Sequence, residues 1–228
     1  VFVFIIILIV YAFTINANGN TFNPGHISGI LSSQNTVIVG TMAIGMAMVI
    51  ITGQIDLSLG SSLVLCTGVT IMAYNATGGN VLVMILAALG SGLVCGTING
   101  VLVGYAKMPP FIVTLGTMLI YRSIAQYYLR TTGSSIYNMD GTLSSYDAFY
   151  GFGQEKLATI PVVGLIFVLV CVIMVFMSNK TKFGKTVYAI GSNEKAARLA
   201  GVNVEFTTVM VYVITGLLVG LSAFLWMA

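Results

Sequence analysis

Side chains that commonly do catalytic chemistry are rare in this sequence and do not form a recognisable set. His26 is the one histidine of the chain, and the three cysteines, Cys66, Cys95 and Cys171, all lie within apolar runs. No cysteine forms a CxxC pair or lies near His26 at the spacing of metal ligands, so we expect buried free thiols and no metal site. Because HExxH and GxSxG motifs are absent as well, no catalytic residue and no enzymatic activity are predicted.

One short string comes close to a phosphate-binding motif. Gly184-Lys185-Thr186 matches the end of a P-loop, but Asn179 stands where that loop needs its first glycine. No soluble strand precedes the string to present such a loop. We therefore predict no nucleotide cofactor on this chain. If ATP drives its activity, a partner subunit must bind and hydrolyse the ATP.

Asp56 is the acidic residue with the strongest functional signal, because it lies between two long apolar runs. An ionisable residue beside a segment that crosses a membrane is costly and is a functional candidate. Nearby glycines can interrupt a helix, and Asp56, Ser58 and Ser61 would then line a translocation path or gate. Alternatively, Asp56 only caps a helix that begins at Leu57. The sequence leaves both interpretations open.

A stripe of small residues recurs every four positions along one apolar run. Such a stripe lets a second helix approach closely, so helix packing is its predicted role. Asn99 lies beside the stripe and can either join helices or contact a substrate, as can Thr114 in the next run. The stripe consists of Ala88, Gly92, Gly96, Gly100 and Gly104.

The elements that must position these residues are membrane helices. Mean hydropathy is +1.01, and only 7% of the residues are charged, against about 25% in soluble domains. Backbone groups in lipid must pair internally, which leaves helices or a closed barrel. The apolar runs are continuous rather than alternating, as in residues 162–177, and this pattern excludes barrel strands.

We predict an all-α membrane protein, a polytopic transmembrane helix bundle with about seven spans, since a helix needs about 20 residues to cross a bilayer. Lysine and arginine concentrate between residues 179 and 206, which places that loop in the cytoplasm and the 130–160 loop outside. The predicted spans are 1–15, 35–53, 57–74, 81–106, 111–129, 161–178 and 207–228.

The cytoplasmic loop is expected to contain a short helix. Ser192 and Asn193 can cap it, and Glu194 in its first turn is favoured by the helix dipole. Gly201 is expected to end the helix in a left-handed conformation. A short helix held between two spans can insert into a groove of a partner protein. The loop can equally serve only to set topology through its positive charge.

Four segments of the chain match the patterns of one known family, in the same order. They are the cytoplasmic string FGKTVYAIGSNEKAARLAGVNV, the strings GMAMVI and ITGQIDLSLGSSL, and INGVLVGYAKMPPFIVTLGTMLIYRS. These segments resemble the permease subunits of bacterial sugar-importing ABC transporters in the ribose, xylose and galactose branch, and the cytoplasmic string is similar to their coupling loop. Gln54 stands where the pattern usually has glycine. The resemblance covers nearly the whole chain, from about Phe22 to Ala228.

This resemblance implies a multi-pass protein of the bacterial cytoplasmic (inner) membrane that imports a simple, ribose-like sugar. It implies three kinds of protein partner besides membrane lipid: a second permease copy, cytoplasmic ATP-binding-cassette ATPases, and an extracytoplasmic sugar-binding protein. The 130–160 loop would then dock the binding protein, or else lie at the lipid interface. The coupling residues would be Gly184, Tyr188, Gly191, Asn193, Glu194, Ala197, Arg198 and Gly201.

Family permeases have about ten spans. Because the chain begins at Val1 without methionine and ends at Ala228 within an apolar run, we expect one transmembrane permease domain truncated at both ends.

Two other functions stay open. An ion-coupled secondary transporter would need charged residues within its spans, and apart from Asp56 and Arg122 the spans offer few. A non-transporting membrane anchor for a cytoplasmic complex needs no charged residues within its spans. No nucleic-acid partner is expected, because the net charge is only +3.

Overall fold

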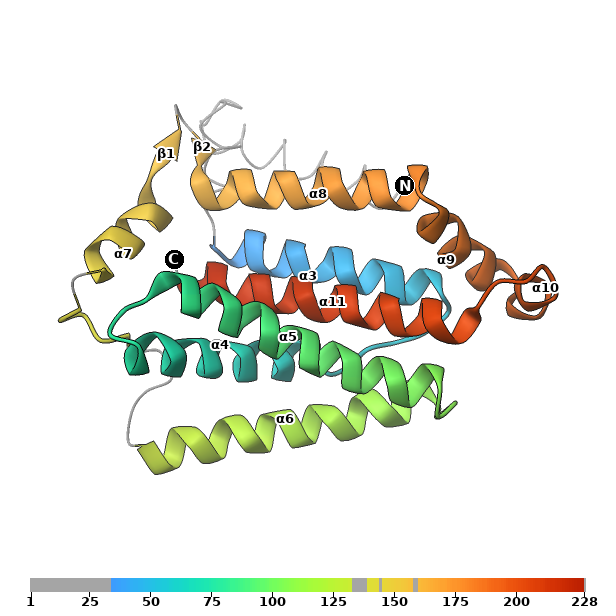
Figure 1. The fold of residues 1–228 in the computed structure, drawn as a ribbon, viewed down its shortest axis with the longest axis horizontal. Coiled ribbons are helices and arrows are strands. Elements are labelled where there is room, and N and C mark those ends of the chain that lie inside the picture. Colours follow the sequence, from blue (N-terminus) through green and yellow to red (C-terminus); the bar gives the residue numbers. More distant parts are fainter. Residues whose placement is uncertain (1–33, 133–138, 144, 158–159, 228) are drawn as a thin grey trace, which may run out of the picture.

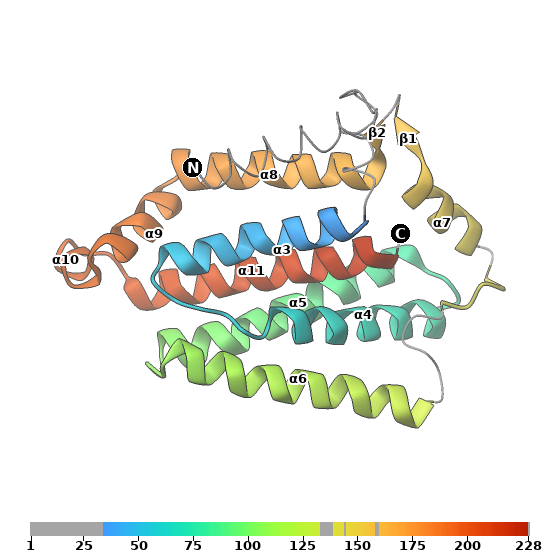
Figure 2. The same ribbon diagram turned by 180° about the vertical axis from the view of Figure 1, so that it is seen from behind.

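The structure is a computed structural model that describes residues 34–132, 139–143, 145–157 and 160–227. Six long helices run side by side along one axis (Figures 1 and 2). The elements are α3 (Gln34–Ile51), α4 (Leu59–Ala76), α5 (Val81–Gly104), α6 (Pro110–Thr132), α7 (Tyr146–Gln154), β1 (Lys156–Leu157), β2 (Ile160–Pro161), α8 (Val162–Lys180), α9 (Lys182–Ser192), α10 (Glu194–Leu199) and α11 (Val204–Met227).

Helices occupy six of the predicted spans, with boundaries that differ by a few residues, and α6 is not among those that meet the length and hydropathy of a membrane span. Helices α4, α5, α8 and α11 are long and apolar enough to cross a membrane, and α3 is apolar but shorter. The predicted span 1–15 lies outside the described residues. The all-α polytopic fold is thus confirmed, and the one small addition is the antiparallel pair of two-residue strands β1 and β2.

The described parts of the 130–160 and 179–206 loops lie at opposite ends of the bundle, as predicted. Helices α9 and α10 lie at one end, together with the connections α3–α4 and α5–α6 (Figures 1 and 2). Helix α7, the β1–β2 pair and the connection α4–α5 lie at the other end. We call the α9–α10 end the cytoplasmic end, following the positive charge of its loops.

Helix α11 forms the centre of the bundle, packed against α5, α3 and α4. The small-residue stripe of α5 is the surface that α11 approaches. A Cβ at Gly92 would overlap the Gly216 carbonyl oxygen, and one at Gly96 would overlap the Tyr212 carbonyl oxygen. The approach is looser at Gly100 and Gly104, where a Cβ would lie 2.9 Å and 2.8 Å from the carbonyl oxygens of Val209 and Glu205. Small residues therefore let the two helix backbones touch, as the spacing predicts.

Helix α3 ends in a Schellman motif. Gly53 has a positive φ of 77°, and its N–H donates to the Ile50 carbonyl at 2.9 Å, while the N–H of Gln54 donates to Val49 at 3.1 Å. These two bonds satisfy carbonyls that the helix end would leave unpaired. The end of α3 is therefore a fixed point from which the next segment leaves.

Helix α4 begins at Leu59, two residues later than predicted, and this corrects the assignment of Asp56 as the residue that directly precedes the helix. Asp56 Oδ1 accepts hydrogen bonds from the N–H of Ser58 at 2.8 Å and from its hydroxyl at 2.6 Å. Such a bond to the residue two positions on forms a local turn that competes with helix. Ser58 therefore precedes the helix, and its side chain makes no capping bond.

Candidate functional site

The cytoplasmic end presents two consecutive short helices, α9 and α10, where the sequence predicts only one. Thr181 caps α9 by accepting from the N–H of Gly184 at 3.1 Å. The predicted cap of α10 by Asn193 is confirmed, since its Oδ1 accepts from the N–H of Ala196 at 3.0 Å. Gly201 ends α10 with φ 83°, also as predicted. Ser192 instead belongs to the last turn of α9.

Two glycines let α9 touch the neighbouring helix ends. A Cβ at Gly184 would overlap the carbonyl oxygens of Met177 and Ser178 in the last turn of α8. A Cβ at Gly191 would overlap the carbonyl oxygen of Ile51, the last residue of α3. Helix α9 therefore connects the ends of α8 and α3 by backbone contact at both of its own ends.

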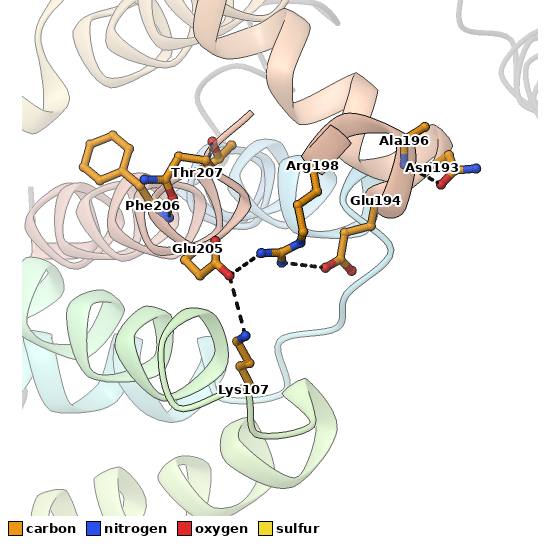
Figure 3. Close-up of polar contacts among 9 residues, drawn as sticks. Lys107, Asn193, Glu194, Ala196, Arg198, Glu205, Phe206 and Thr207 are labelled. Carbon is orange, nitrogen blue, oxygen red and sulfur yellow. Dashed lines mark hydrogen bonds and ion pairs between the residues drawn. The ribbon is translucent and has the colours of Figure 1, made fainter. Parts of the chain in front are cut away.

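Ion pairs join α10 to the rest of the cytoplasmic end. Figure 3 shows Glu205, in the first turn of α11, between Arg198 and Lys107. Glu205 Oε1 accepts from Arg198 at 2.5 Å and lies 3.8 Å from the Lys107 ammonium. Arg198 also donates to Glu194 one turn earlier, at 3.1 Å. These four residues, called the ion-pair network below, connect α10, α11 and the α5–α6 turn.

The charged groups of the ion-pair network are exposed to solvent to different degrees, and none of them is buried. The hydrogen bonds to Glu205 and then to Glu194 raise the pKa of Arg198 above its ordinary value. Exposed pairs of this kind contribute little to stability, because solvent screens the charges. The network therefore fixes where α10 lies more than it stabilises the fold. Lys107 takes part from a left-handed backbone conformation, with φ 53°.

The outer face of α9 and α10 is open. Leu199 is 91% exposed, the most exposed of the large apolar side chains in the described part of the chain. Tyr188 is about half exposed, at 48%. Among the other coupling residues predicted from the sequence, Ala197 and Gly184 are buried, whereas Gly191, Asn193, Glu194, Arg198 and Gly201 are exposed.

A second group of polar side chains lies inside the bundle, close to the same end. The Asn99 side-chain amide donates to the Ser58 hydroxyl at 2.8 Å. The Thr114 hydroxyl donates to the Pro110 carbonyl of its own helix at 2.9 Å and lies 3.4 Å from the Ile55 carbonyl. Asp56, Ser58, Asn99 and Thr114, called the inner polar cluster below, are all buried. Ser61 is buried one turn into α4 but bonds only to the carbonyl of Ser58.

The inner polar cluster has unused hydrogen-bonding capacity. Among the described residues, Asn99 Oδ1, Tyr212 Oη and Gln54 Oε1 are buried without a hydrogen-bond partner. A buried polar atom without a partner costs about 1–3 kcal/mol, which calls for an explanation at a native site. Hydroxyl-rich ligands or water can satisfy such atoms. No three His, Cys, Asp or Glu side chains among the described residues are grouped to hold a metal.

A cavity of about 700 Å³ opens between the ion-pair network and the connection that follows α3. It reaches inward as far as Thr208, one turn into α11. Its wall includes Thr52, Gln54, Lys107, Pro110 and Arg198.

Three contributors to this end were missed from the sequence. Lys107 and Glu205 lie almost a hundred positions apart, and no local pattern pairs them. The exposure of Leu199 could have been predicted from the sequence, because a large apolar residue in a short, charged surface helix has no core to pack into. The predicted coupling residues and path residues occupy one end of the bundle but form two separate groups.

Comparison with known proteins identifies one family. The family described as "Branched-chain amino acid transport system / permease component" matches residues 29–228. The ribose import permease protein RbsC of Escherichia coli (strain K12) is 34% identical over 224 residues, which cover 98% of this chain and 68% of the relative.

Two further relatives are named for other sugars. The galactofuranose transporter permease protein YtfT of Escherichia coli (strain K12) is 37% identical over 78% of this chain and 50% of its own length. The xylose transport system permease protein XylH of the same strain is 32% identical over 95% of this chain and 68% of its own length. No solved structure matches the chain.

Proposed function

The chain belongs to the family of branched-chain amino acid transport system permease components, and from this premise we propose that it is the permease subunit of an ATP-binding-cassette importer for a simple sugar. It is a multi-pass protein of the bacterial inner membrane. Its relatives are transport components, and the ATPase is proposed to be a separate subunit, since the near-match at Gly184-Lys185-Thr186 forms part of α9 rather than a phosphate-binding loop.

The proposed substrate is a ribose-like monosaccharide. The family description names branched-chain amino acids, but the three relatives named above are permeases for ribose, galactofuranose and xylose. An amino-acid substrate would need groups that pair its ammonium and carboxylate. A sugar needs uncharged donors and acceptors, and Ser58, Asn99 and Thr114 supply these in the inner polar cluster. These three residues, together with Asp56 and Ser61, are the proposed lining of the path or gate.

The observation that carries the proposal is the construction of the α9–α10 unit. Backbone contacts at Gly184 and Gly191 fix α9 to two long helices, while α10 presents Leu199 and Glu194 outward. A loop that served only to set topology would need its positive charge but neither helix. The unit has the form of a short plug for a groove on a cytoplasmic ATPase.

Three further partners follow from the proposed function. An extracytoplasmic binding protein would dock at the opposite end, where Tyr146 and Tyr150 of α7 stack with ring centroids 6.2 Å apart. A second permease copy and membrane lipid would cover the exposed apolar side chains of the long helices. These include Leu86, Phe111, Val172 and Phe176.

In the proposed mechanism, ATP binding closes two ATPase subunits on each other and moves the α9–α10 unit of each permease. The path then alternates between openings on the two sides of the membrane. Such a change requires that nucleotide bind one conformation better than the other, since a ligand shifts an equilibrium only by its differential affinity. No step of this cycle requires a catalytic group on this chain.

Co-purification and uptake test the proposal together. The full-length permease would be tagged in its native host and purified in mild detergent, and mass spectrometry would identify what accompanies it. A stoichiometric P-loop ATPase is expected. Uptake of labelled ribose, xylose, galactose and leucine by the reconstituted complex would then name the substrate class. Uptake of leucine but no sugar would refute the sugar assignment.

The burial of Asp56 keeps one other function in view, an ion-coupled secondary transporter. In that case the permease would purify alone and take up sugar in response to an ion gradient without ATP. A chain that purifies with partners but transports nothing would instead fit the membrane anchor. Cysteine labelling along α4 and α5 would then find no water-accessible position.

A further inference from the structure

The cavity of about 700 Å³ at the cytoplasmic end is lined by charged and uncharged polar side chains from several elements. Resting on the proposed function, we propose that this cavity binds a phosphorylated monosaccharide from the cytoplasm and that its occupation inhibits import. The volume lies within the range of about 300–1,000 Å³ that is typical of small-molecule sites. No step of the import cycle proposed above involves this cavity.

The charge of the cavity wall favours an anion. Three cations and two carboxylates line it, which leaves a net charge of +1: Lys107, Lys195, Arg198, Glu194 and Glu205. Both carboxylates accept from Arg198, as Figure 3 shows, so their charges are directed toward its guanidinium. Lys195 forms no ion pair with any described residue. A phosphate group would therefore meet a cation that no carboxylate of the described chain occupies.

Lys107 is a second cation that a phosphate can recruit. Its ammonium lies 3.8 Å from Glu205, whereas Arg198 bonds to the same carboxylate oxygen at 2.5 Å. The backbone of Lys107 is left-handed, with φ 53°, and such costly conformations are concentrated at functional sites. Pro110, the first residue of α6, borders the same cavity, and the positive end of the helix dipole adds to the attraction. Lys107 can therefore turn to an anion without breaking a short ion pair.

Uncharged groups in the same wall suit the hydroxyls of a sugar. The side chain of Thr208, one turn into α11, lines the cavity and makes no hydrogen bond to another described residue. Gln54 lines it as well, and its Oε1 is buried without a hydrogen-bond partner among the described residues. A sugar hydroxyl both donates and accepts, so it can satisfy either group. A phosphate dianion only accepts, so it would leave the Gln54 oxygen unpaired.

The position of the cavity gives such a ligand a regulatory effect. Phosphorylation adds a charge that prevents an imported sugar from returning through the membrane, so the product stays on the side to which the cavity opens. A ligand held by Lys195 of α10, Lys107 of the α5–α6 turn and Thr208 of α11 joins three elements. It stabilises the conformation described here over any in which these elements separate, and it thereby opposes the transport cycle.

Direct binding tests the site. Isothermal titration calorimetry would measure the affinity of the full-length permease, in lipid nanodiscs, for ribose 5-phosphate, ribose and inorganic phosphate. Ribose 5-phosphate should bind at least about tenfold more tightly than either of the others. Lys195→Gln and Lys107→Gln should each weaken its binding about fivefold or more. Lys182→Gln, which changes an exposed lysine outside the cavity wall, is the matched control and should keep the wild-type affinity.

Thr208→Val separates recognition of the sugar from recognition of the phosphate. The substitution keeps the branched shape of the side chain and removes a hydroxyl that bonds to no described residue. Affinity for ribose 5-phosphate should fall about fivefold, whereas affinity for inorganic phosphate should stay the same. The thermal midpoint of the variant verifies that it is folded. An unchanged affinity for ribose 5-phosphate in the folded variant would overturn the recognition of the sugar in this cavity.

Uptake tests the inhibition, and it does so from one side of the membrane. The complex with ATPase and binding protein would be reconstituted in liposomes that enclose ATP. Ribose 5-phosphate enclosed with the ATP should lower uptake of labelled sugar at least about fivefold at saturation, whereas the same compound added outside should have no effect. Lys195→Gln should raise the concentration for half-maximal inhibition about fivefold.

The proposed function and the regulatory site fail in different ways. A wild-type complex without ATP-driven sugar uptake would refute the proposed function, while binding could still be measured on the permease alone. Equal affinity for ribose would make the cavity part of the substrate path, and equal affinity for inorganic phosphate would make it an anion site only; either result overturns the inference. Unchanged affinity in both lysine variants overturns the location. Full uptake with the sugar phosphate enclosed overturns the inhibition.

Discussion

The side-chain amide of Asn99 donates a 2.8 Å hydrogen bond to the hydroxyl of Ser58, a residue 41 positions earlier in the chain. The same hydroxyl donates to Asp56 at 2.6 Å. Ser58 thus connects the segment before α4 to α5. Asn99 keeps one buried acceptor atom unused. These hydrogen bonds join Asp56, Ser58 and Asn99 into one connected group, so substitutions in it can be tested together.

Replacing Asp56 tests whether its charge or its hydrogen bonds matter. An asparagine oxygen can accept both bonds from Ser58, so Asp56→Asn should keep sugar uptake within about threefold of the wild type. Asp56→Leu removes the acceptor and should lower uptake more strongly, with an unchanged amount of protein in the membrane. Uptake of labelled sugar by cells is the measurement. Complete loss in Asp56→Asn would favour the ion-coupled transporter instead.

Close packing of α5 on α11 makes Gly96 sensitive to any added atom. A Cβ there would overlap the Tyr212 carbonyl, so Gly96→Ala should destabilise the fold by about 1–3 kcal/mol through overpacking. The readout is the thermal midpoint of the full-length protein in detergent. Gly90→Ala on the same helix is the control and should be neutral or slightly stabilising. Equal midpoints for the two variants would contradict the predicted contact.

Leu199 is predicted to be an anchor for the partner ATPase. Its side chain is 91% exposed, and burying a leucine contributes about 1.5–3 kcal/mol. Leu199→Asp should therefore weaken ATPase binding by about tenfold or more without changing the stability of the permease. Leu199→Met preserves most of the apolar volume and serves as the control. Co-purification of the ATPase at graded salt and detergent would show the difference, and equal retention by both variants would argue against an anchor.

The ion-pair network should position α10 without stabilising the fold much. A double-mutant cycle on Arg198→Ala and Glu205→Ala should give a small coupling free energy that falls with added salt. Stimulation of the ATPase by the binding protein should drop in both single variants, because α10 loses its attachment to α11. Lys182→Ala, an exposed lysine outside the network, is the control. A coupling energy that is insensitive to salt would contradict the exposed character of these pairs.

The sequence by itself determined the class of fold and the local features of the cytoplasmic end. Continuous apolar runs fix where helices must form, because lipid leaves backbone groups no other partner. The cap at Asn193 and the left-handed Gly201 could also be predicted from the sequence, because each depends on bonds within a few residues. The spacing of Gly92, Gly96 and Gly100 indicated a close helix neighbour without identifying it.

Helix α9 shows where local preference failed. The sequence analysis predicts no helix over KFGKTVYAIGS, in which two glycines disfavour a helix by about 1 kcal/mol each. In the folded chain the same glycines allow contact with α8 and α3, and this tertiary packing outweighs the local penalty. The start of α4 was also misplaced, because Asp56 bonds to Ser58 rather than acting as the residue before the helix.

Only the tertiary structure decided which helices and side chains meet. That α11 covers the glycine stripe, that Asn99 reaches Ser58, and that Glu205 lies between Arg198 and Lys107 all join positions far apart in sequence. A hydrophobic pattern indicates which face of a helix avoids water. It does not indicate which helix, or whether lipid, will cover that face, because every apolar neighbour satisfies it equally well. Partner choice depends on shape and on polar groups that fit only when the whole bundle has assembled.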